Sequence, residues 1–126
     1  MTIRNVFTES LAVKERLLLG NELSKLEEMG EMIALVIKGG NKLMLCGNGG
    51  SAADAQHLAA EMLVRLRPNY NREGIAAISL AQDTSTITAC GNDYSFDDIF
   101  CRPFEALSKK NDILFVISTS GNSKYS

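Results

Sequence analysis

Two polar turns and one histidine–glutamate pair carry the residue types in this sequence that could do chemistry. The first turn, residues 46–51, reads Cys-Gly-Asn-Gly-Gly-Ser and follows the apolar run Leu43–Leu45. Glycines between a strand and a helix let the backbone approach a ligand closely, and the first amides of the helix have no partner within it. Such a turn can bind an anion. The alternative is that Gly49 and Gly50 only tighten the connection.

The second turn, residues 118–123, reads Ser-Thr-Ser-Gly-Asn-Ser and follows the apolar residues Val116 and Ile117. Its hydroxyls can donate several hydrogen bonds to phosphate oxygens, and its glycine frees the backbone. Taken alone, a turn of this composition is more often a loop or a helix cap. Placed beside the first turn at the same edge of a sheet, it predicts a pocket for a small phosphorylated molecule.

His57 and Glu61 stand four residues apart on the helix predicted to follow the first turn. Residues at this spacing share a helix face, so the imidazole and the carboxylate can reach the same ligand or the same metal ion. A solvated surface pair is the alternative. Because the pair would lie close to the predicted phosphate pocket, we expect it to act on the molecule bound in that pocket. Gly91, Asn92 and Asp93 are predicted to form a turn that could also present polar groups.

Strands and helices alternate around these residues. Apolar residues at helical spacing predict two helices between Val6 and Lys38, broken at Gly20 and Asn21. Continuously apolar strands separated by helices indicate a parallel sheet covered on both faces, a three-layer αβα sandwich of the α/β class. Ligands of such sheets bind beyond the carboxyl ends of the strands, where both turns lie. The predicted strands span 42–46, 75–80 and 112–117, and the predicted helices 52–66, 84–90 and 97–108.

Composition narrows the class of protein. A chain of 126 residues with a net charge of −2 is sized for one domain and has no charge that favours nucleic acid or an anionic membrane. Without an apolar run of about 20 residues or a signal peptide, we expect a cytoplasmic protein.

The cysteines lack metal-type spacing and are expected to be buried, with a reactive Cys46 as the alternative. Leu17–Leu19 put apolar side chains on more than one helix face, which predicts a partner subunit.

The chain resembles the SIS (sugar isomerase) domain family, and within it the phosphoheptose isomerases. The matching stretches are Cys46–Glu61, the pair Arg65 and Arg67, Asp83–Phe100 and Ile117–Ser123. The resemblance implies a flavodoxin-like strand order and a single SIS domain over residues 1–126, with an N-terminal helical hairpin (1–40) and an α/β core (41–126). It also implies the isomerisation of sedoheptulose 7-phosphate to D-glycero-D-manno-heptose 7-phosphate, a precursor of lipopolysaccharide heptose.

The same resemblance implies roles for individual residues. Glu61 corresponds to the acid/base residue, and His57 with Glu61 to two zinc ligands. A homotetramer with sites shared between subunits is also implied. The residues implied to bind the substrate are Asn48, Gly49, Gly50, Ser51, Glu61, Asn92, Asp93 and, around the phosphate, Ser118, Thr119, Ser120 and Ser123.

The chain stops at Ser126, before the later strands and the C-terminal helix whose glutamine and histidine complete the family's site. We therefore expect a piece of the enzyme that ends after its third strand, with little activity alone, or one that partners complete. Two non-catalytic alternatives are an SIS-domain protein that binds the bacterial replication initiator and a sugar-phosphate sensor. Gly50 and Glu61 favour the enzyme, because the initiator-binding relative has other residues at these two positions.

Overall fold

The computed structural model describes residues 1–122, and its contacts divide the chain into two compact units. The first unit is Met1–Leu35, and the second begins at Val36. Two helices, α1 (Ile3–Leu19) and α2 (Glu22–Lys38), account for nearly all of the first unit, with α2 ending in the second. The assignment of the whole chain to one domain stays a prediction.

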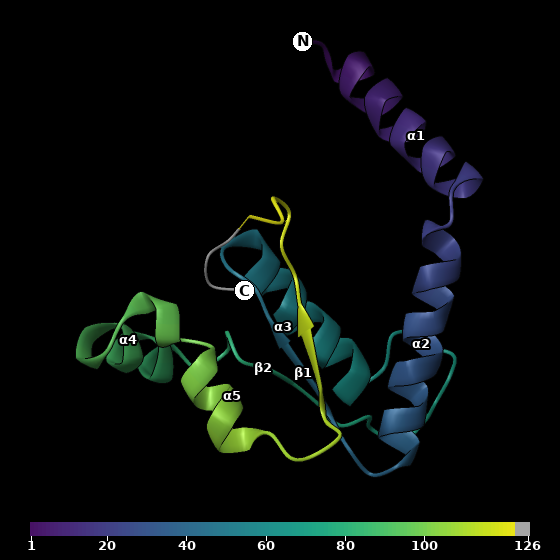
Figure 1. The fold of residues 1–126 in the computed structure, drawn as a ribbon. Helices are drawn as coiled ribbons and strands as arrows, with labels where there is room; N and C mark the ends of the chain where they lie inside the picture. The colour runs from purple at the N-terminus through teal and green to yellow at the C-terminus, as the bar shows by residue number, and fades with distance from the viewer. Residues whose placement is uncertain (123–126) are drawn as a thin grey trace. The chain divides into compact units, whose positions relative to one another are not determined.

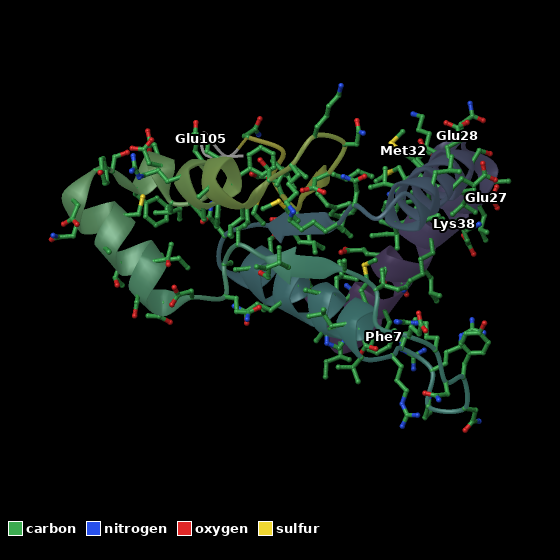
Figure 2. All side chains as sticks on the ribbon, turned by 90° about the horizontal axis from the view of Figure 1, so that it is seen from below. Phe7, Glu27, Glu28, Met32, Lys38 and Glu105 are labelled. Atoms are coloured by element: carbon green, nitrogen blue, oxygen red, sulfur yellow. The ribbon has the colours of Figure 1, made fainter. Side chains whose placement is uncertain are left out.

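The break between the two helices is confirmed, whereas the helical hairpin is not found. The backbone amide of Gly20 caps α1 by donating to the carbonyl of Leu17, and α2 begins at Glu22. However, α1 contains no buried residue and makes no extended contact with residues 22–35. Phe7 and Met32, both labelled in Figure 2, are 69% and 59% exposed. A hairpin would require these helices to cover one another, and within this unit their apolar side chains stay uncovered.

The second unit is built on a three-stranded parallel sheet (Figure 1). Its strands are β1 (Leu43–Cys46), β2 (Ala77–Ser79) and β3 (Ile113–Val116), in the order β2-β1-β3. Every residue of β1 is buried, because β1 is the central strand and both of its faces are covered. This order matches the first three strands of a flavodoxin-like sheet, as predicted.

Helices cover both faces of the sheet, which confirms the three-layer α/β prediction. On one face α3 (Gly50–Leu63) packs against β1 and β2 through its buried residues Ser51, Ala55 and Ala59. On the other face lie α4 (Thr84–Asp93), the short 3-10 helix η1 (Phe96–Asp98) and α5 (Cys101–Leu107). The core on that side consists of Met44, Cys46, Leu80, Ala81, Cys90, Ile99 and Phe100.

Asp112 fixes β3 beside β1 at the amino ends of the strands. Its carboxylate accepts hydrogen bonds from the backbone amides of Lys42 (3.0 Å) and Lys109 (2.7 Å) and from the side chain of Asn41 (3.1 Å). It also pairs with the ammonium of Lys42, and its side chain is only 2% exposed. The hydrogen bond from Lys42 is the main reason why the pKa of Asp112 lies well below its usual range. This cluster lies at the end of the sheet opposite to the two polar turns.

Three sequence predictions need correction. Residues 91–93 are not a loop turn but the last turn of α4, because Asp83 caps the start of that helix, Cys90 packs into the core and the helix continues to Asp93. The single helix predicted over 97–108 is divided into η1 and α5. Cys101 is exposed, whereas Cys46 and Cys90 are buried as predicted. Within residues 1–122, no helix is long and apolar enough to cross a membrane.

Candidate functional site

The glycine turn after β1 presents backbone amides at the start of α3. Gly49 has φ 57°, in the region that favours glycine. The amide of Ser51 donates to the carbonyl of Asn48 (3.0 Å), and that of Ala52 to the carbonyl of Gly49 (3.1 Å). The amides of Gly49 and Gly50 have no acceptor among the residues that the structure describes, and both glycines are exposed. These two amides can therefore bind an anion or a hydroxyl oxygen.

The serine turn after β3 holds its hydroxyls in place through its own backbone. The hydroxyl of Ser118 accepts from the amide of Gly121 (3.1 Å), and that of Ser120 accepts from the amide of Asn122 (3.2 Å). Each hydroxyl keeps its own proton for donation to a ligand. Thr119 and Ser120 are exposed, as a phosphate contact requires. Ser123 lies outside the described residues.

Gly47 brings the two turns together. The amide of Ile117 donates to the carbonyl of Cys46 (2.9 Å), which extends the pairing of β1 and β3 as far as the turns. A Cβ atom on Gly47 would lie 2.9 Å from the carbonyl oxygen of Ile117 and 2.7 Å from the Cβ of Ser51. Only a glycine at position 47 leaves room for the end of β3 and the start of α3 to lie this close to the backbone of the first turn. Sequence reasoning missed Gly47, although its place directly after an apolar strand was visible.

His57 and Glu61 lie side by side on α3, as predicted. The Nε2 of His57 is 3.6 Å from the Oε1 of Glu61, and their side chains are 73% and 26% exposed. The other carboxylate oxygen of Glu61, Oε2, is buried and has no hydrogen-bond partner in the described part of the chain. A buried polar atom without a partner costs free energy, and in native proteins such atoms gather at functional sites.

A cavity of about 330 Å³ joins the histidine to the strand that leads into the serine turn. Ile117 lines it from the carboxyl end of β3 and directly precedes Ser118. Of the predicted site residues that the structure describes, His57 lines this cavity, and the serine turn begins one residue beyond its lining residue Ile117. Its lining residues are Asp54, His57, Leu58, Phe115 and Ile117.

Asn92 and Asp93, two further predicted contacts, lie at the end of α4 and do not line this cavity. The amide of the Asn92 side chain donates to the carboxylate of Asp93 (2.7 Å) at the end of α4. Asp93 lines a different cavity, of about 630 Å³, whose lining comes from α4, α5 and Tyr94 and includes no residue of either turn. The side chain of Ser51 is buried on the sheet-facing side of α3. The substrate contacts of these residues, like those of both turns and of Glu61, stay predictions.

His57 and Glu61 fit part of a zinc site. Imidazole nitrogen and carboxylate oxygen are both common zinc ligands, and Nε2 of His57 lies 3.6 Å from Oε1 of Glu61. A protein zinc site uses about three or four such ligands. Among residues 1–122, no cluster of three or more His, Cys, Asp or Glu side chains could hold a metal ion. The described residues therefore offer fewer ligands than a zinc site needs.

A family model described as the SIS domain matches residues 7–126, and the chain belongs to that family. Among curated relatives, it is 53% identical to the phosphoheptose isomerase of Campylobacter concisus over 104 residues, which are 82% of this chain and 54% of that protein. It is 50% identical to the phosphoheptose isomerase of Shewanella frigidimarina over 125 residues, 96% of this chain and 60% of that protein. The predicted resemblance is thus confirmed.

Solved structures agree with the sequence comparison. The phosphoheptose isomerase GmhA of Neisseria gonorrhoeae superposes with a TM-score of 0.88 at 39% identity, covering 98% of this chain and 62% of that one. The phosphoheptose isomerase of Francisella tularensis has a TM-score of 0.83 at 30% identity, covering 99% and 66%. The chain spans 54–60% of the length of the two curated relatives above, so it matches part of each.

Proposed function

We propose that the protein containing these residues is a phosphoheptose isomerase that converts sedoheptulose 7-phosphate to D-glycero-D-manno-heptose 7-phosphate. The observation that carries the proposal is the carboxylate of Glu61, which lies beside His57 and has one buried oxygen without a hydrogen-bond partner in residues 1–122. The phosphoheptose isomerases to which the chain is about half identical support the choice of substrate.

In this proposal the two ends of the sugar are bound by different residues. The hydroxyls of Ser118, Thr119 and Ser120, with Ser123, donate to the phosphate oxygens. The amides of Gly49 and Gly50 and the side chain of Asn48 contact the sugar near the start of α3. Binding at both ends would orient the reacting carbons, and orientation of this kind lowers the activation free energy.

Glu61 is the proposed acid/base residue. Isomerisation of a ketose to an aldose moves a proton between two adjacent carbons, and a carboxylate can remove a proton from a carbon beside a carbonyl. Its buried Oε2 accepts no hydrogen bond from the described residues, so it can accept the proton. We propose that His57 and Glu61 are also the zinc ligands that this chain supplies. When bound, zinc would stabilise negative charge on the substrate oxygen.

The proposal also covers the assembly of the protein and its location in the cell. The apolar side chains exposed along α1 and α2 support a homotetramer, since a partner subunit would cover them. Three free cysteines agree with a reducing compartment, and we propose the cytoplasm.

The test is conversion of sedoheptulose 7-phosphate by the purified full-length protein that contains these residues, followed by NMR in deuterated water. We expect the aldose 7-phosphate to appear with deuterium at the carbon that receives the proton. Unphosphorylated sedoheptulose is the control and should turn over far more slowly, because it lacks the group that the serine turn binds. A protein that binds the sugar phosphate without forming any aldose would contradict the proposal and favour a sensor.

A further inference from the structure

The guanidinium of Arg72 lies against the last turn of the helix that carries Glu61. Its Nη2 donates to the backbone carbonyl of Glu61 (2.7 Å), and its Nη1 donates to the carbonyl of Met62 (2.8 Å). Nη1 also donates to the carbonyl of Glu73 in the loop that follows (2.8 Å). The last carbonyls of a helix have no partner within it, so Arg72 satisfies two of them from outside.

The loop after α3 returns to the same end of the helix. The amide of Ile75 donates to the carbonyl of Met62 (3.0 Å), and a Cβ on Gly74 would lie 2.8 Å from the carbonyl oxygen of Leu63. No other donor within residues 1–122 reaches the carbonyl of Glu61. The positive charge of Arg72 at a helix C-terminus is also favourable, since the helix dipole is negative there.

Glu61 depends on its backbone for its position. A carboxylate that accepts hydrogen bonds is oriented by its donors, but Oε2 of Glu61 has none among the described residues and Oε1 is 3.6 Å from His57. The side chain is therefore placed by the turn from which it projects. That turn is held by Arg72.

We propose that Arg72 is a positioning residue for Glu61, which it holds through the backbone of α3. The proposal rests on the proposed function, in which Glu61 moves the proton. Replacing Arg72 by Ala would release the carbonyls of Glu61 and Met62 and loosen the last turn of α3. A shift of about 1 Å in a catalytic group can reduce the rate about 100-fold. Arg72 donates to the C-terminal end of α3, whereas Gly49 and Gly50 lie at its N-terminal end, so substrate binding should not change.

The experiment compares Arg72→Ala, Arg72→Lys and a control, Asn71→Ala, an exposed neighbour in the same loop. For Arg72→Ala we expect kcat to fall about 100-fold with an unchanged Kd for sedoheptulose 7-phosphate. Arg72→Lys should recover part of the loss, because an ammonium can donate to a carbonyl but lacks the two-pronged geometry of the guanidinium. Asn71→Ala should behave as the unaltered protein does.

Hydrogen exchange provides a readout that does not depend on activity. The amides of Leu63 and Val64 should exchange about fivefold faster in Arg72→Ala, as expected when a helix end loses its cap. Faster exchange with unchanged kcat would refute the positioning role while leaving the isomerase proposal intact. An unaltered protein without turnover would refute the isomerase proposal, and the exchange rates would still show whether Arg72 orders the helix end. Equal losses of kcat in Arg72→Ala and Arg72→Lys, with a raised Kd, would mean general disruption and overturn the proposal.

Discussion

Gly47 is the position where a single added methyl group should separate the two turns. An alanine Cβ there would lie 2.7 Å from the Cβ of Ser51, 2.8 Å from the carbonyl oxygen of Ser51 and 2.9 Å from that of Ile117. These atoms belong to the backbone or are attached directly to it, so no flexible side-chain end can move aside. Relief requires that the start of α3 move away from the end of β3.

The expected cost follows from two opposing effects. Overpacking of this kind typically costs about 1–3 kcal/mol. Replacing glycine by alanine also restricts the unfolded chain, which returns about 0.4–1 kcal/mol where the backbone conformation suits both residues. Gly47 does not have a positive φ, so the second effect applies. Three contacts shorter than 3.0 Å put the overpacking cost in the upper part of its range, about 2–3 kcal/mol, so we expect Gly47→Ala to lower the free energy of unfolding by about 1–2.6 kcal/mol.

Urea unfolding followed by circular dichroism measures this change as a lower midpoint. The control is Gly30→Ala in α2, where an added Cβ has no neighbour within 4 Å. Because glycine inside a helix is destabilising, this variant should gain about 0.5–1 kcal/mol. Gly47→Ala should also weaken the binding of sugar phosphate, since the two turns would no longer adjoin. If Gly47→Ala were as stable as the unaltered protein, the close approach of the turns would be refuted.

Three further predictions concern stability, thiol reactivity and phosphate binding. Asp112→Asn should lower the melting temperature at pH 7. The difference from the unaltered protein should shrink as the pH falls below 3.8, the usual pKa of the group. The lowered pKa of Asp112 stabilises the fold only while the carboxyl group of the unfolded chain is ionised. A difference that is independent of pH would argue against this. Ellman's reagent should label the exposed Cys101 in the native protein but Cys46 only after unfolding. The reason is that Cys46 is buried and that burial raises the pKa of its thiol. Rapid labelling of the native Cys101→Ser variant would disprove this prediction. Replacing Ser118 and Ser120 together by Ala should raise the Kd for sugar phosphate about tenfold or more, and an unaltered Kd by calorimetry would remove the serine turn from the site.

The parts of the fold that depend on local sequence were predictable. β1 is apolar at every position because it is the central strand, and the glycines that follow it mark the start of α3. The i, i+4 spacing of His57 and Glu61 placed their side chains within 3.6 Å of each other. The break at Gly20 was likewise visible as a helix end.

The parts of the fold and of the site that depend on contacts between distant residues could not be predicted from the sequence. The role of Gly47 follows from the carbonyl of Ile117, which only the pairing of β1 with β3 brings near. Arg72 stands in a polar loop, and nothing in its neighbours shows that it reaches the carbonyl of Glu61. Asn92 and Asp93 have turn propensity, yet they continue α4 because the packing of that helix overrides the local preference.

The role of Glu61 is tested most directly by Glu61→Gln, which keeps the size of the side chain and removes its ability to accept the proton. We predict that turnover of sedoheptulose 7-phosphate falls by a factor of about 10²–10⁴, the usual contribution of a general base. In the same sample, calorimetry should give an unchanged Kd for the substrate, because the serine turn remains intact. Turnover equal to that of the unaltered protein would contradict the central claim that Glu61 moves the proton.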